Sequence, residues 1–103
     1  MNAFIITYSE RAKKDLDNLF VTITVDYKAP ITAYRYIQGI IDTIKMISKS
    51  PESFSIAMQK SLLLRYGFNV RRVNYKKMAI IYTIHNNVVY IHRIIANSMI
   101  INL

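Results

Sequence analysis

The stretch MAIIYTIHNNVVYIHRII, from Met78 to Ile95, decides the fold of this 103-residue chain. β-Branched and aromatic residues dominate both halves, and Asn86 and Asn87 separate them. This pattern is typical of two antiparallel strands joined by a two-residue hairpin turn. We predict strands over residues 78–85 and 88–95. The turn predicts three cross-strand pairs, which are Ile84 with Val89, Tyr82 with Ile91, and Ile80 with Arg93.

Side chains alternate between the two faces of a strand, so this register divides the hairpin into two sets. The first face carries Ile80, Tyr82, Ile84, Val89, Ile91 and Arg93. The second face carries Ile81, Thr83, His85, Val88, Tyr90, His92 and Ile94. Because the second set is more polar, we expect that face to be the more hydrated one.

Two amphipathic helices are predicted before the hairpin. Ser9 suits a helix N-cap, and apolar residues follow it at helical spacing, namely Ala12, Leu16, Leu19, Phe20 and Ile23. The β-branched run at residues 21–25 leaves the end of this helix open. Pro30 is well placed to begin the second helix, and Ser50 and Pro51 end it. The apolar stripe of that helix consists of Ala33, Ile37, Ile40, Ile41, Ile44 and Ile47.

Shorter segments complete the expected architecture. Residues 3–8 and 68–74 are predicted strands, and residues 52–61 a loop. The apolar tail, residues 98–103, either closes over the core or forms a strand that awaits a partner. We therefore predict one α+β domain over residues 1–103. It has an N-terminal strand and an antiparallel helical hairpin packed on a mostly antiparallel sheet of about four strands.

Charge is distributed unevenly along the chain. The formal net charge is +8, and all six acidic residues lie within the first 52 positions, whereas residues 53–103 contain seven Lys and Arg residues. A basic half of this kind attracts polyanions. The chain has no cysteine, and neither a secretory signal nor a membrane-spanning run is visible. We therefore expect a cytoplasmic protein.

Most catalytic chemistries find no support in the residues. The two histidines have no cysteine or nearby acid with which to bind a metal, and two glycines cannot form a phosphate-binding loop. We expect no metal and no cofactor. The candidates that remain for catalysis are Arg71, Arg72, His92 and Arg93. Alternation places Arg71 and Arg72 on opposite faces of the sheet, and a mid-strand histidine is more typical of a structural role than of a general base.

A wider set of basic and aromatic residues forms a candidate binding surface. Arginine binds phosphate in a two-pronged fashion, lysine supplies a point charge, and aromatic rings stack on bases. The candidates for binding a target or a nucleic acid are Lys60, Arg65, Arg71, Arg72, Tyr75, Lys76, Lys77 and Tyr90. Half-buried packing within the sheet is the competing explanation for the tyrosines.

Three segments of the chain carry a recognisable pattern. They are YSERAKKDLDNL (8–19), ISKSPESF (47–54) and VRRVNYKKMAIIYTIHNNVVYIHRII (70–95). In their order and spacing they resemble the RelE/ParE superfamily of bacterial toxins. The resemblance implies the toxin half of a type II toxin–antitoxin, or plasmid-stabilisation, module, and the superfamily fold agrees with the one predicted above. It also implies a cognate antitoxin. The charge of this chain predicts that the antitoxin binds through an acidic amphipathic segment.

Members of this superfamily act on one of two targets. RelE-like toxins are metal-free nucleases that cut mRNA in the ribosomal A site, whereas ParE-like toxins inhibit DNA gyrase. Two cations common in RelE-like nucleases are missing here, because Ala79 and the uncharged segment 96–99 occupy their positions. In the strand before that of Ala79, Arg71 and Arg72 match basic residues of the superfamily. The resemblance therefore favours a growth-inhibiting, gyrase-binding toxin without enzymatic activity. The alternatives are a ribosome-dependent mRNA endoribonuclease and a basic nucleic-acid-binding domain outside toxin biology.

Overall fold

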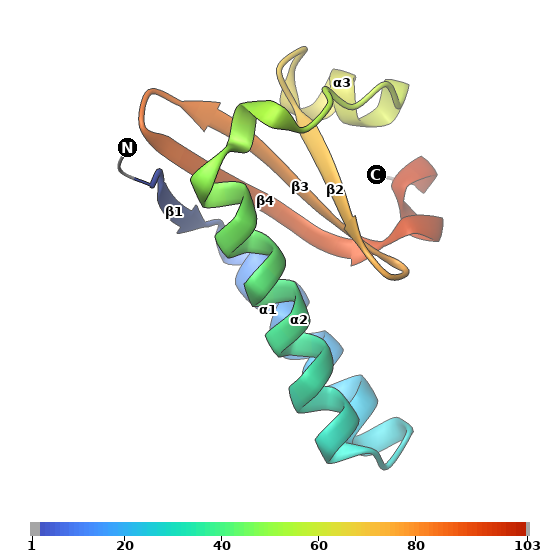
Figure 1. The fold of residues 1–103 in the computed structure, drawn as a ribbon. Coiled ribbons are helices and arrows are strands. Elements are labelled where there is room, and N and C mark those ends of the chain that lie inside the picture. Colours follow the sequence, from blue (N-terminus) through green and yellow to red (C-terminus); the bar gives the residue numbers. More distant parts are fainter. Residues whose placement is uncertain (1–2, 103) are drawn as a thin grey trace.

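A computed structural model describes residues 3–102, whose strands form one sheet in the order β1-β4-β3-β2 (Figure 1). The strands are β1 (Ile5–Tyr8), β2 (Arg71–Tyr75), β3 (Met78–His85) and β4 (Val88–Ala96). β1 pairs with β4 in parallel, and the other two pairs are antiparallel. The predicted α+β fold with a mostly antiparallel sheet is confirmed. Strand β2 begins three residues later than the start predicted for it.

The helical hairpin covers one face of the sheet and extends well beyond it (Figure 1). It consists of α1 (Glu10–Val21) and α2 (Pro30–Lys49). Ser9 caps α1, since its Oγ accepts a hydrogen bond from the backbone N–H of Ala12 at 2.9 Å. After Val21 the chain continues as a π-helix over Thr22–Asp26, in the β-branched run whose end the sequence left open.

The main core lies between the hairpin and the sheet, where burial of apolar surface is the principal stabilising effect. Its buried residues from the helices are Ala12, Ile40, Ile44 and Ile47. Those from the strands are Met78, Ile80, Tyr82, Val89, Ile91 and Ile94. Six residues of the predicted helical stripes belong to this core, since Leu16 and Leu19 pack against the four buried ones. Phe20 is 42% exposed, and Ile23, Ala33, Ile37 and Ile41 are not among the core residues.

A second, smaller core lies on the opposite face of the sheet and was not predicted. The prediction that residues 52–61 form a loop was only partly right. The segment begins within a 3-10 helix (Pro51–Ser53) and ends within the first turn of the helix α3 (Lys60–Tyr66). A 3-10 helix, η3 (Asn97–Asn102), follows β4. The buried residues of this second core are Ala57, Leu62, Val70, Ala79, Ile81, Ile95 and Ile100. The face expected to be hydrated is therefore covered in part by α3 and η3. The tail closes over this second core through Ile100, while residue 103 lies outside the described residues.

The predicted hairpin register is correct only near the turn. Ile84 pairs with Val89 and Tyr82 with Ile91, but Ile80 pairs with Ile94 and Ile81 with Arg93. A β-bulge causes this shift, because His92 is an extra residue in β4 opposite the Ile81–Tyr82 step. The prediction that Arg93 faces Ile80 was therefore wrong.

Asn86 adopts a φ of +56°, a left-handed conformation that asparagine tolerates, and the two-residue turn is confirmed. Within residues 3–102, no helix is long and apolar enough to cross a membrane.

Candidate functional site

Arg71 lies on β2 and holds the segment after α2 against the sheet. Its Nη1 donates hydrogen bonds to the backbone carbonyl of Phe54 and, at 3.3 Å, to that of Glu52. Its strand partner is Tyr82, a member of the main core beneath the helical hairpin. The guanidinium of Arg71 is therefore engaged in positioning the backbone of residues 52–54.

Arg72, the next residue, pairs with Ile81 of the second core and so points to the other face, as predicted. Its Nε donates to Oδ1 of Asn74 at 3.1 Å, and its Nη2 donates to Oδ1 of Asn97 at 2.8 Å. Both acceptors are neutral amides. They fix the plane of the guanidinium without neutralising its charge.

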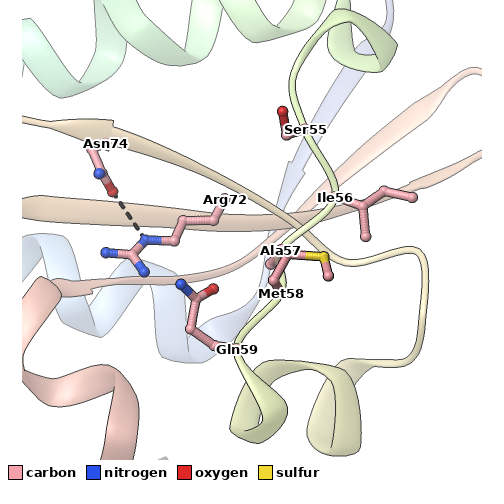
Figure 2. Close-up of a pocket in the computed structure, with 7 residues that line it drawn as sticks. All are labelled: Ser55, Ile56, Ala57, Met58, Gln59, Arg72 and Asn74. Atoms are coloured by element: carbon pink, nitrogen blue, oxygen red, sulfur yellow. Dashed lines mark hydrogen bonds between the residues drawn. The ribbon is translucent and has the colours of Figure 1, made fainter.

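Figure 2 shows Arg72 at the edge of a pocket between β2 and the extended segment 55–59. The pocket has a volume of about 360 Å³, and Asn74 and Gln59 line it with Arg72. Asn74 is two residues from Arg72, so strand alternation could have placed the two on one face. Asn97 and Gln59 are distant from Arg72 in the sequence, and no sequence pattern linked either of them to it.

Arg93 forms an ion pair with Asp15 of α1. The Nε and Nη2 atoms of Arg93 lie 2.8 Å and 3.1 Å from the two carboxylate oxygens of Asp15. The hydrogen bond that Arg93 donates to Asp15 is the main effect that raises the pKa of Arg93, and burial opposes it. Asp15 was not among the predicted site residues, because its partner is 78 positions away.

His92, the bulged residue, lies in a polar and aromatic cluster. The Oγ1 atom of Thr83 is 2.7 Å from Nε2 of His92 and 2.8 Å from Nε2 of His85. Because one hydroxyl carries one proton, it donates to one ring and accepts from the other. Tyr66 and Tyr90 contact the imidazole of His92, with ring centroids at 4.6 Å and 4.8 Å.

Burial lowers the pKa of His92, and the charge of His85 lowers it further. A neutral imidazole of this kind is suited to hydrogen bonding within the cluster rather than to holding a phosphate.

The remaining predicted residues are distributed over several elements. Tyr75 packs edge-on against Tyr36 of α2, with ring centroids 5.3 Å apart, and the Nζ of Lys76 lies 5.6 Å from both ring centroids. Lys77 is exposed at the same turn. Lys60 and Arg65 are exposed on α3.

The four candidate catalytic side chains therefore do not share one set of partners. Arg71 binds backbone carbonyls, Arg93 binds a carboxylate, and His92 binds a hydroxyl on the sheet. Arg72 alone among these four combines neutral partners with a place at the described pocket. Among residues 3–102, no group of three or more His, Cys, Asp or Glu side chains is arranged to bind a metal.

Comparisons with known proteins agree with this architecture. The family profile described as "ParE toxin of type II toxin-antitoxin system, parDE" matches residues 6–101. The chain belongs to the ParE toxin family. This family consists of toxins of type II toxin–antitoxin systems, as the resemblance to the RelE/ParE superfamily predicted. No curated protein matches it in sequence.

Two solved structures share the ParE fold of this chain. A chain of the chromosomal ParDE toxin–antitoxin system from P. aeruginosa superposes with a TM-score of 0.73 and 15% sequence identity, over 91% of this chain and 96% of that one. A chain of the toxin–antitoxin complex RelBE2 from Mycobacterium tuberculosis gives a TM-score of 0.65 and 13% identity, over 93% of this chain and 100% of that one. At these identities the similarity establishes the fold alone.

Proposed function

We propose that this ParE-family toxin inhibits growth by binding a core cellular target such as DNA gyrase, and that a cognate antitoxin neutralises it. The match to the ParE profile over residues 6–101 carries this proposal and also supports a single toxin domain over residues 1–103. A cytoplasmic location follows from such a target.

The contacts that Arg71 and Arg93 make within the fold favour a toxin that binds its target over one that cleaves RNA. Metal-free cleavage requires a base, an acid and cations within hydrogen-bond reach of one phosphate. Arg71 and Arg93 instead hold structural partners, and buried Ala79 stands where a RelE-like arginine is expected. Loss of one transition-state donor costs about 100- to 1,000-fold in rate, so the loss of two brings cleavage close to background.

An antitoxin partner is supported by the two structural neighbours, which come from toxin–antitoxin systems. The net charge of +8 favours an acidic amphipathic segment as the part of the antitoxin that binds. Co-expression with the adjacent reading frame should yield a stable complex. Separate elution of the two proteins at low salt would contradict this part of the proposal.

The target is tested with two assays on the purified toxin. We expect inhibition of plasmid supercoiling by DNA gyrase and no inhibition of a topoisomerase of another class. Primer extension on translating ribosomes should show no new A-site cleavage. Strong cleavage that is lost in Arg71→Ala or His92→Ala, with both variants folded, would instead establish the endoribonuclease alternative.

A further inference from the structure

His85 and His92 converge on one oxygen atom on the second face of the sheet. The Nε2 atoms of the two rings lie 2.8 Å and 2.7 Å from the same Oγ1 of Thr83. These are the only two histidines of the chain. The sequence alone predicted no metal, because neither histidine has a cysteine or an acid near it in the chain, but the fold makes each histidine the neighbour of the other.

The two rings differ in how firmly they are held. The imidazole of His92 lies between Tyr66 of α3 and Tyr90 of β4, with ring centroids at 4.6 Å and 4.8 Å, and is half-buried. The side chain of His85, the last residue of β3, is exposed beside the hairpin turn. One ring is therefore preorganised, whereas the other faces solvent and can adjust its position.

Imidazole nitrogens select a narrow class of cation. A neutral imidazole binds borderline-soft ions such as Zn²⁺ through the lone pair of one nitrogen, at about 2.0–2.1 Å, whereas Mg²⁺ and Ca²⁺ prefer oxygen ligands. Without an ion, the hydroxyl of Thr83 donates its proton to one Nε2 and accepts the proton of the other. When that second ring carries its proton on Nδ1 instead, both Nε2 lone pairs are available and both rings stay neutral.

We propose that Nε2 of His85 and Nε2 of His92 together bind one Zn²⁺ ion, with water completing its coordination. Among residues 3–102, no group of three or more His, Cys, Asp or Glu side chains is arranged around a metal. With two protein ligands the ion exchanges with solvent, unlike that of a closed structural site. The ion joins the end of β3 to the bulge of β4 and so favours the folded state. This inference does not rest on the target proposed above.

The test uses the full-length toxin without a polyhistidine tag, so that His85 and His92 provide its only imidazoles. Isothermal titration calorimetry with zinc chloride measures the affinity and the number of ions per chain. We expect one ion, and we expect His85→Gln and His92→Gln each to weaken its binding at least about tenfold, equivalent to about 1.4 kcal/mol. Magnesium chloride should not bind at the same concentration. Zinc should also raise the unfolding temperature of the wild type but not that of the double variant His85→Gln/His92→Gln.

Asp42→Asn is the matched control for binding of zinc to a surface carboxylate. Asp42 is exposed on α2, where its Oδ1 accepts a hydrogen bond from Gln38 at 3.1 Å. Its removal should change the zinc affinity less than about twofold. If His92→Gln does not fold, as judged by circular dichroism, His85→Gln decides the question, because the side chain of His85 is exposed.

Three results would overturn the proposal. Two ions per chain, one of which is lost in each single variant, would show that the histidines bind zinc separately. An unchanged affinity in His85→Gln would exclude that ligand, and wild-type affinity in the double variant would place the ion elsewhere. The gyrase assay fails independently. Gyrase inhibition without zinc binding rejects this site alone, whereas zinc binding without an effect on gyrase rejects the target alone.

Discussion

Asp15 of α1 and Arg93 of β4 form a bidentate ion pair with N–O distances of 2.8 Å and 3.1 Å. Their side chains are only 10% and 13% exposed. The same carboxylate also accepts the backbone N–H of Ile94 at 2.9 Å, and Oγ of Ser9 donates to the carbonyl of His92 at 2.7 Å. β1 ends at Tyr8 and therefore does not pair with the later part of β4. The residues at the start of α1 supply hydrogen-bond partners for the backbone of β4 in that part.

Asp15→Asn should destabilise the toxin by about 2–4 kcal/mol, because it leaves a largely buried guanidinium without its counter-charge. The matched control is Asp17→Asn, an exposed position on the same helix, which should change the free energy of unfolding by less than about 0.5 kcal/mol. Urea unfolding at neutral pH measures both. Equal effects of the two substitutions would mean that the ion pair contributes nothing beyond a surface charge.

Gly39 of α2 faces Tyr75, and a Cβ at this position would overlap the tyrosine ring and hydroxyl. Gly39→Ala should therefore destabilise the protein by about 1 kcal/mol, although alanine has the higher helix propensity. In a Tyr75→Ala background the same substitution should instead stabilise by about 0.5–1 kcal/mol, because the overlap is absent and the propensity gain remains. A double-mutant cycle by urea unfolding measures the change of sign. The same sign in both backgrounds would contradict the packing argument.

The lowered pKa of His92 predicts a loss of stability in mild acid. Below the unfolded-state value of about 6.5, the unfolded chain binds a proton that the native state does not, so stability falls as pH decreases towards the native pKa. His92→Gln should flatten this part of the profile of unfolding temperature between about pH 5 and pH 8. His85→Gln should flatten it in part, because it removes one of the two effects on the pKa of His92. A His92→Gln profile parallel to that of the wild type would refute the assignment.

Tyr82 is fully buried, and its hydroxyl donates to the carbonyl of Pro51 at 2.7 Å. Burial raises the pKa of Tyr82 to about 12, and the charge of Arg71 acts in the opposite direction. The unfolded chain therefore loses this proton at lower pH than the native state, so stability should fall as pH rises from 10 to 12.

Tyr82→Phe should remove that component of the alkaline pH dependence. At neutral pH it should cost about 1–2 kcal/mol, because the carbonyl of Pro51 is left without a donor. Urea unfolding at neutral and alkaline pH measures both effects, and Tyr34→Phe serves as a control at a tyrosine that is 66% exposed. If Tyr82→Phe has no effect at neutral pH, the hydrogen bond to Pro51 is not a significant contributor.

Local pattern alone determined much of the fold. β3 spans Met78–His85 as predicted, and α2 begins at Pro30 and ends just before the predicted stop. These predictions succeed because hydrophobic periodicity, a helix-starting proline and a two-residue Asn-Asn turn act over a few neighbouring residues. The superfamily resemblance and the concentration of positive charge in the second half are likewise properties of the sequence itself.

Tertiary structure decided the rest, because the interactions involved join residues far apart in the chain. The bulge at His92 shifts the register between Ile81 and Tyr82, and no local sequence pattern indicates the extra residue. The seven-residue helix α3 is too short to be stable alone and depends on Leu62, which is buried against the sheet. The sequence shows where the arginines are, but only the contacts made in the folded protein distinguish their roles. A distant aspartate neutralises Arg93, whereas two neutral amides leave the charge of Arg72 available at a pocket.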